Sequence, residues 1–206
     1  MTFREVEEWV RSELPAPPAR VLEIGAGDGA LARALRDAGW DVTAIDPKSE
    51  TPDVSPVALV DLPSPEALYD AAVAVVSLHH VEPLEESLER LATVLVHGAP
   101  LLLDEFDASM LDERASAWWL TQRHARGGDD PETPEELGPK MRAKVHAIED
   151  LTRVLARWFD VDEPVRGLYL YRWHLDESVH PEEQRLVDEE ELPRTGVRII
   201  ARRKAR

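Results

Sequence analysis

The chain has 206 residues, and its 24 lysines and arginines against 41 aspartates and glutamates give a formal net charge of −17. This length allows one sizeable core in a single α/β domain, and the absence of cysteine excludes a disulfide framework and a cysteine-based zinc site. An acidic surface repels phosphate backbones, so nucleic acid is not an expected partner.

The first segment, MTFREVEEWVRSELP, is charged and lacks the apolar core of a signal peptide. No run approaches the roughly 20 apolar residues that cross a bilayer, so we expect a cytoplasmic protein with no membrane partner, acting as a monomer or homodimer. Apolar residues at helical spacing predict a helix over residues 3–14, and the prolines of 15–19 end it.

The first half of the chain alternates apolar runs with amphipathic segments, which is the pattern of parallel strands joined by crossover helices. The run at 72–78 is almost wholly apolar, as in a central strand covered on both faces. Ser64-Pro65-Glu66 predicts the start of a short helix. The predicted strands are 20–24, 41–45, 56–60, 72–78 and 99–104; the predicted helices are 83–96 and one ending near 38, with Asp28 as its N-cap and Gly39 as its C-cap.

The second half carries fewer regular signals. Helical periodicity covers 111–124 and 149–158, separated by a turn-rich, polar stretch at 127–139. Strands are predicted at 165–175 and 196–202, joined by an acidic segment at 180–192. In the first of these strands, alternation would place Tyr169, Tyr171 and Trp173 on one face.

The stretch VLEIGAGDGALARAL, residues 21–35, leads from a predicted strand through three glycines into a predicted helix. Gly25, Gly27 and Gly29 permit positive φ and let a ligand approach the backbone closely. Asp46 ends the next strand, 21 positions after Gly25, which is the place for a carboxylate that accepts both hydroxyls of a ribose. The pattern therefore predicts a site for a nucleoside-containing ligand.

Glu23 lies two residues before the first glycine and narrows the choice of ligand. Its carboxylate would repel the pyrophosphate of a dinucleotide and attract a ligand that carries positive charge. S-adenosylmethionine has an adenosine, a sulfonium and an amino-acid end, so it fits this requirement. NAD remains an alternative, because Gly25, Gly27 and Ala30 also satisfy the pattern G-x-G-x-x-A.

The sequence resembles the class I S-adenosylmethionine-dependent methyltransferases in the motif VLEIGAGDG, in AID at 44–46, in the segment 60–95 and in the strand APLLLDEFD. The resemblance covers residues 20–107. It implies that Glu23 and the Gly25 backbone hold the methionine amino end, that Asp46 holds the ribose and that Ser77 and Leu78 line the methyl side. It also implies that Asp61 accepts from the adenine amino group beside the Leu62 backbone, and it adds the neighbouring residues Ala26, Gly27 and Pro47 to the cofactor site.

Pattern and resemblance together predict a Rossmann-like, doubly wound α/β fold. Its sheet is mostly parallel and seven-stranded, with helices on both faces and a helical lid insertion after the fifth strand. The expected single domain comprises an N-terminal helix (1–19), a cofactor-binding half (20–107), the lid (108–146) and a C-terminal helix with strands (147–206). Only 14 residues separate Asp46 from Asp61, where the family usually fits a helix and a strand, so either that helix is reduced to a turn or the third strand lies elsewhere.

Methyl transfer is an in-line displacement that needs positioning and exclusion of water rather than a metal. The candidate catalytic residues are His79 and His80, which follow the fourth predicted strand, and Glu105, which follows the fifth. The histidines could equally serve only to end the strand. The sequence has no His-x-x-x-His pattern, so we expect no metal site. We expect methyl transfer to an O or N atom of a small molecule; the alternatives are a protein or peptide methyltransferase and an NAD-dependent Rossmann protein.

Overall fold

A computed structural model describes residues 4–63 and 65–205, and within them the strands form one seven-stranded sheet. Its order is β2-β1-β3-β4-β7-β5, with β6 also paired to β7. The first four strands run parallel, and β7 runs antiparallel to its three neighbours, so the predicted α/β fold is confirmed. The strands are β1 Arg20–Ile24, β2 Asp41–Ile45, β3 Ala71–Val75, β4 Pro100–Phe106, β5 Phe159–Val161, β6 Val165–Gly167 and β7 Gly196–Arg203.

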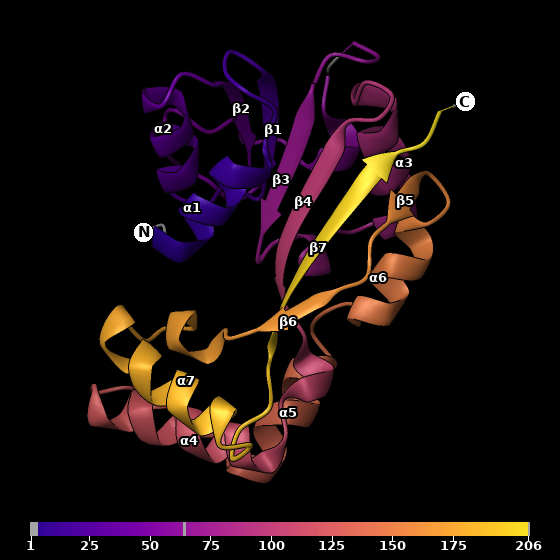
Figure 1. The fold of residues 1–206 in the computed structure, drawn as a ribbon. Coiled ribbons are helices and arrows are strands. Elements are labelled where there is room, and N and C mark those ends of the chain that lie inside the picture. The colour runs from indigo at the N-terminus through magenta and orange to yellow at the C-terminus, as the bar shows by residue number, and fades with distance from the viewer. Residues whose placement is uncertain (1–3, 64, 206) are drawn as a thin grey trace.

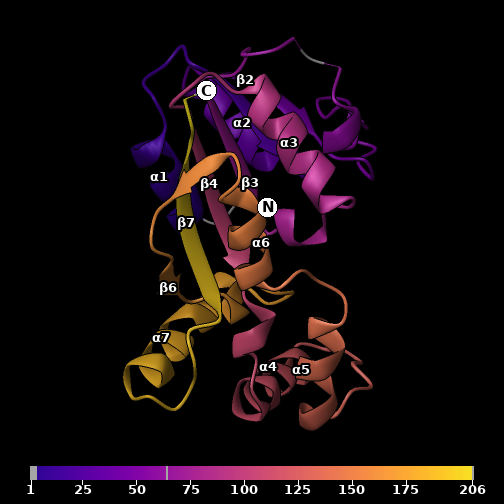
Figure 2. The same cartoon turned by 90° about the vertical axis from the view of Figure 1, so that its right-hand side faces the viewer.

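Helices cover both faces of the sheet. On one face, α1 (Arg4–Glu13) and α2 (Ala30–Asp37) pack against a cluster that includes Val21 and Val73. On the other, α3 (Leu84–Val94) and α6 (Ile148–Leu155) pack against Leu22 and Leu103, and Figure 2 shows both helices in front of the strands. The alternation of buried side chains along each strand divides the core into these two layers.

Three further helices gather beyond the carboxyl ends of β3 and β4, as Figure 1 shows. They are α4 (Glu113–Ala125), α5 (Pro134–Arg142) and α7 (His180–Asp188). We call them the helical unit; it has its own apolar core around Leu111, Trp119 and Leu186. The turn-rich stretch at 127–139 therefore includes the start of α5, and the acidic segment at 180–192 includes α7. No helix in the described part of the chain is long and apolar enough to span a membrane.

The prediction of a strand at 56–60 is wrong. After β2 the chain makes only a single bridge, between Ile45 and Ser55, and then a 3₁₀ turn at Leu59–Asp61 (η1). Pro56 has no N–H to donate to a ladder, and the 14-residue connection leaves no room for a helix as well. Pro65 has no regular secondary structure and Glu66 lies in a turn, so no helix begins there, and Ser64 lies outside the described residues.

The prediction of a strand at 165–175 is correct only over residues 165–167, which form β6. Residues Leu170–Arg172 form a 3₁₀ turn (η4) instead. The cause is Glu183 of α7, whose buried carboxylate accepts the backbone N–H groups of Tyr169, Leu170 and Tyr171 at 2.7–3.0 Å. Those donors are consequently withdrawn from any ladder. As a result the aromatic residues do not share one face, and the short strand β5 was not predicted.

Candidate active site

Two adjoining cavities, of about 610 and 410 Å³, lie at the carboxyl ends of the parallel strands. They share Gly25, Val76 and His80 in their walls, so they are parts of one site. The carboxyl edge is where open α/β sheets bind ligands. Val76, between the two cavities, has a φ of +51°, which is unusual for a β-branched residue and is the kind of strain that functional sites hold.

The first two glycines of the loop have different roles. Gly25 has φ +70°, and a Cβ there would lie 2.3 Å from the Cβ of Ser77. The Ser77 hydroxyl donates to the carbonyl of Ile24 at 2.7 Å, which ties the ends of β1 and β3 together. Gly27 has φ +55°, and a Cβ there would meet nothing within 4 Å. Gly25 therefore allows tight packing within the protein, whereas Gly27 leaves open space for a ligand.

Two carboxylates hold this loop. Asp46, directly after β2, accepts from the N–H of Gly27 at 3.0 Å and from the N–H of Lys48 at 2.8 Å, and it lines the smaller cavity together with Pro47. Asp28 accepts from the N–H of Ala30 at 3.0 Å, although the N-cap position of α2 is Gly29 and not Asp28 as predicted. Asp46 is thus fixed at the cavity wall by the loop it supports.

Glu23 of β1 lines the larger cavity with Ala26 and is only 4% exposed. Among the described residues its Oε2 atom has no hydrogen-bond partner. Burial raises the pKa of this carboxyl to about 8, and Asp28 adds to the shift. The guanidinium groups of Arg36 and Arg33 and a hydrogen bond from the Ala32 N–H oppose it. The side chain is consequently mostly protonated at neutral pH, and a cation entering the cavity would favour its ionised form.

The smaller cavity has largely apolar walls from Ile24, Ile45 and the segment Val57–Leu59. A flat ring fits such a wall. Asp61 is exposed and Leu62 is buried with its carbonyl accepting from Arg90 at 2.9 Å, and neither residue is in the described walls of these two cavities. Their adenine roles stay predictions. The segment 57–59 was missed because its sequence was interpreted as a strand.

The two candidate histidines differ in environment. His79 lines the larger cavity, is 2% exposed and has its Nδ1 hydrogen-bonded to Oε2 of Glu105. His80 lines both cavities, and burial together with the neighbouring His79 lowers its pKa, so it is largely neutral at pH 7. A neutral imidazole at the cavity wall can accept a proton.

Glu105 is fully buried and does not line either cavity. Its Oε1 atom accepts from the N–H groups of Leu78 at 2.8 Å and Ser77 at 3.3 Å. It therefore positions the His79 ring and the turn after β3. Ser77 lines the smaller cavity, and Leu78 lies beneath it in the core.

Replacing Glu105 by alanine is expected to destabilise the protein by about 3 kcal/mol, since it leaves the His79 ring and the N–H groups of Leu78 and Ser77 without their acceptor. Urea unfolding measures this loss. Glu86→Ala, an exposed glutamate of α3, is the control and should change the free energy of unfolding by less than about 0.5 kcal/mol. Equal stability of the two variants would contradict the positioning role.

The far wall of the larger cavity is aromatic. Phe106 stacks on Tyr169 with ring centroids 4.8 Å apart, and Trp173 lies 5.5 Å from Phe106 and stacks on Trp119 at 4.0 Å. Phe106, Tyr169 and Trp173 line the cavity together with Arg172. These residues come from β4 and from the turn that Glu183 holds, and their sequence spacing carried no signal of the arrangement.

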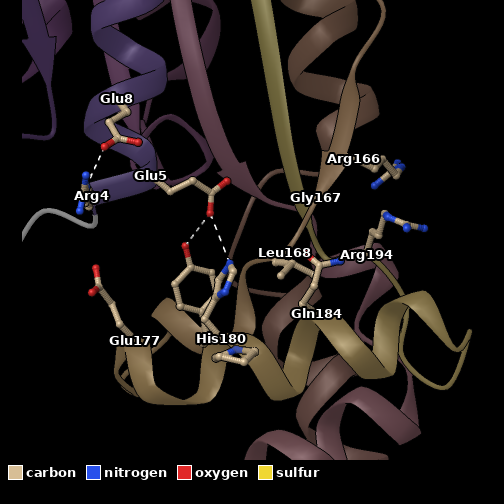
Figure 3. Close-up of a pocket in the computed structure, with 12 residues that line it drawn as sticks. Arg4, Glu5, Glu8, Arg166, Gly167, Leu168, Glu177, His180, Gln184 and Arg194 are labelled. Carbon is tan, nitrogen blue, oxygen red and sulfur yellow. Dashed lines mark hydrogen bonds and ion pairs between the residues drawn. The ribbon is translucent and has the colours of Figure 1, made fainter.

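A third cavity, of about 560 Å³, lies outside this wall between α1 and α7 (Figure 3). Glu5 connects the two helices there, since its carboxylate accepts from the Tyr171 hydroxyl at 3.2 Å and lies 3.5 Å from Nε2 of His180. Its arginines, such as Arg4 with Glu8 at 2.7 Å, are paired with carboxylates. Among the described residues, the arginines of this cavity are therefore already paired and are poorly suited to bind an anion.

A glycine loop after β1, a carboxylate after β2 and cavities at the carboxyl ends of the strands are the features of an α/β protein of the class I methyltransferase fold. A family model described as a methyltransferase domain matches residues 2–138, and the chain belongs to this family.

Relatives of this chain carry the same description. An uncharacterized methyltransferase of Mycobacterium bovis is 34% identical over 107 residues, which cover 47% of this chain and 42% of that protein. One of Staphylococcus carnosus is 39% identical over 94 residues, which cover 41% and 45%. The chain thus spans less than half the length of these relatives. A solved S-adenosylmethionine-dependent methyltransferase of Mesorhizobium loti superimposes with a TM-score of 0.63 at 16% identity, covering 96% of this chain and 98% of that one, which establishes the fold.

Proposed function

We propose that this protein transfers a methyl group from S-adenosylmethionine to an O or N atom of a small molecule. The observation that carries the proposal is Glu23, whose buried Oε2 lacks a partner at the wall of the larger cavity. A buried acceptor without a donor costs stability, and an ammonium group in the cavity would supply the donor.

The residues present fit this cofactor along its length. Glu23 would bind the amino group of the methionine end, beside the space left open at Gly27. Asp46 would bind the ribose, and the apolar wall at Val57–Leu59 would contact the adenine ring. When bound, S-adenosylmethionine supplies a methyl carbon on a sulfonium sulfur. The acceptor atom would bond to this carbon in line with the carbon–sulfur bond, and the sulfur would leave.

The chain's own residues would do two things for this reaction. His80, or His79 held by Glu105, would take the proton that the acceptor loses as its new bond forms. The helical unit would cover the site and exclude water from the reacting atoms. No metal is required, because the leaving group departs as a neutral thioether.

The alternatives are less well supported. NAD would bring a pyrophosphate to the loop beside Glu23 and Asp28, with no lysine or arginine in the described wall of the larger cavity except Arg172 on the far side. A peptide substrate would need an open groove, whereas the helical unit lies across the end of the sheet. We keep the cytoplasm as the proposed location and a monomer or homodimer as the proposed state.

Calorimetric titration with S-adenosylhomocysteine tests the proposal, and NAD serves as the competing ligand. We expect binding of the first and not of the second. Asp46→Asn should weaken binding by about tenfold or more, since hydrogen bonds to a charged acceptor contribute about 1.5–3 kcal/mol. Asp41→Asn, an exposed aspartate at the other end of β2, is the control. Tight binding of NAD, or unchanged affinity in Asp46→Asn, would overturn the assignment.

A further inference from the structure

Arg172 is the only lysine or arginine in the described wall of the larger cavity. Its side chain is 5% exposed, and its Nη2 donates to Oδ1 of Asp104 at 2.6 Å. The Nε atom is buried and has no acceptor among the described residues. A buried guanidinium donor without an acceptor is costly, so this cation is only partly satisfied by the protein.

The carboxylate that faces Arg172 is shared. Oδ2 of Asp104 accepts from Nε of Arg198 at 2.9 Å, and Arg198 also contacts the exposed Glu5 at 3.0 Å. Asp104 therefore gives Arg172 only one of its two oxygens. An anionic ligand in the cavity would complete the pairing of Arg172, and the planar guanidinium suits a carboxylate.

Arg172 is held in place from two sides. The three N–H groups that Glu183 accepts belong to the turn that carries it, and its guanidinium carbon lies 5.2 Å from the Tyr169 ring and 5.8 Å from the Tyr171 ring. A side chain fixed in this way is pre-organised for binding.

Arg172 lies on a different part of the cavity wall from Glu23, where the amino-acid end of the cofactor is proposed to bind. Glu23 is on β1 and Asp104 is on β4, with β3 between them. Two strand spacings are about 10 Å. The ammonium and carboxylate of an amino acid are attached to the same carbon, so they lie much closer together than the backbones of β1 and β4 do. The anion at Arg172 is therefore expected to belong to a different molecule.

The neighbours of Arg172 describe that molecule. Phe106, Tyr169 and Trp173 form an aromatic wall beside the guanidinium within the same cavity. We propose that the methyl acceptor is a small aromatic acid, whose carboxylate pairs with Arg172 and whose ring lies against this wall. This inference rests on the proposed function, and it names the substrate class of the same site.

The test is a binding measurement on the full chain saturated with S-adenosylhomocysteine. The probes are benzoate, phenylacetate and indole-3-acetate, each compared with its neutral amide. At least one acid should bind at least tenfold more tightly than its amide in the wild type, and Arg172→Gln should remove this preference. Arg194→Gln, an arginine on the wall of the third cavity, is the matched control and should retain it. Thermal melting shows whether each variant is folded.

A second measurement distinguishes the two possible sources of the anion. We expect Arg172→Gln to bind S-adenosylhomocysteine and 5′-methylthioadenosine, which lacks the amino-acid end, as tightly as the wild type does. Weakened binding of the first ligand alone would assign Arg172 to the cofactor and overturn the proposal, as would a wild type with no preference for any acid. Failure of the wild type to bind S-adenosylhomocysteine would instead remove the proposed function.

Discussion

Glu23→Gln is expected to remove most of the pH dependence of S-adenosylhomocysteine binding and to weaken it at pH 8. In the wild type, burial raises the Glu23 pKa to about 8, so the carboxyl is protonated over much of the neutral range. The ligand's ammonium favours the ionised form. Affinity should therefore rise by up to about tenfold for each pH unit between pH 6 and 8. Calorimetry in two buffers of different ionisation enthalpy should also detect release of about one proton on binding at pH 7.

The same group makes the stability of the ligand-free protein depend on pH. A carboxyl whose folded pKa is raised from 4.5 to about 8 contributes stability that is fully present below pH 4.5 and lost as the pH rises toward 8. Glu23→Gln should therefore melt at a higher temperature than the wild type at pH 8, with a smaller difference at pH 5. The comparison of the two proteins isolates this group from the other carboxylates of an acidic chain.

Asp28→Asn is the matched control for both measurements, since it removes a carboxylate from the same loop at an exposed position. It should retain the rise of affinity with pH, because Asp28 only adds to the Glu23 shift. A wild-type affinity that is flat between pH 6 and 8 would contradict the assignment of the ammonium to Glu23.

The parts of the site that lie close together in the sequence could be predicted from it. Glu23 lies near the end of β1, Gly25 follows that strand and Asp46 follows the neighbouring strand, so parallel pairing alone brings them to one edge. Local periodicity also predicted α1, α3 and α6 with small errors at their ends. What these features share is that neighbouring residues and regular hydrogen bonding determine them.

The far wall could not be predicted, because its geometry depends on contacts between distant segments. Arg172 is placed by a carboxylate of α7 and by Asp104, 68 positions away. The sequence around it alternates as a strand would, and Glu183 withdraws the N–H groups that a strand requires. The isolated acid that holds this turn looks like one of many surface glutamates in an acidic chain.

Gly27→Ala is expected mainly to weaken ligand binding, whereas Gly25→Ala is expected mainly to lower the stability of the fold. Alanine at residue 27 should cost about 1 kcal/mol for its positive φ and still fold, because no atom lies within 4 Å of the new Cβ. The methyl group would occupy ligand space, so S-adenosylhomocysteine affinity should fall by at least about tenfold. Alanine at residue 25 should lose about 3 kcal/mol of stability, because its Cβ would overlap that of Ser77.

Gly98→Ala is the control for the backbone cost, since Gly98 has φ +79° with nothing within 4 Å and lies before the amino end of β4. It should match Gly27→Ala in stability and bind the ligand as the wild type does. Ser77→Gly alone loses the hydrogen bond to Ile24 and is therefore the reference for the double variant. Adding Gly25→Ala to Ser77→Gly should cost only the part that comes from φ, because the overlap is gone. If Gly27→Ala binds as tightly as Gly98→Ala, the ligand does not approach the loop at residue 27, and the cofactor orientation proposed from Glu23 is wrong.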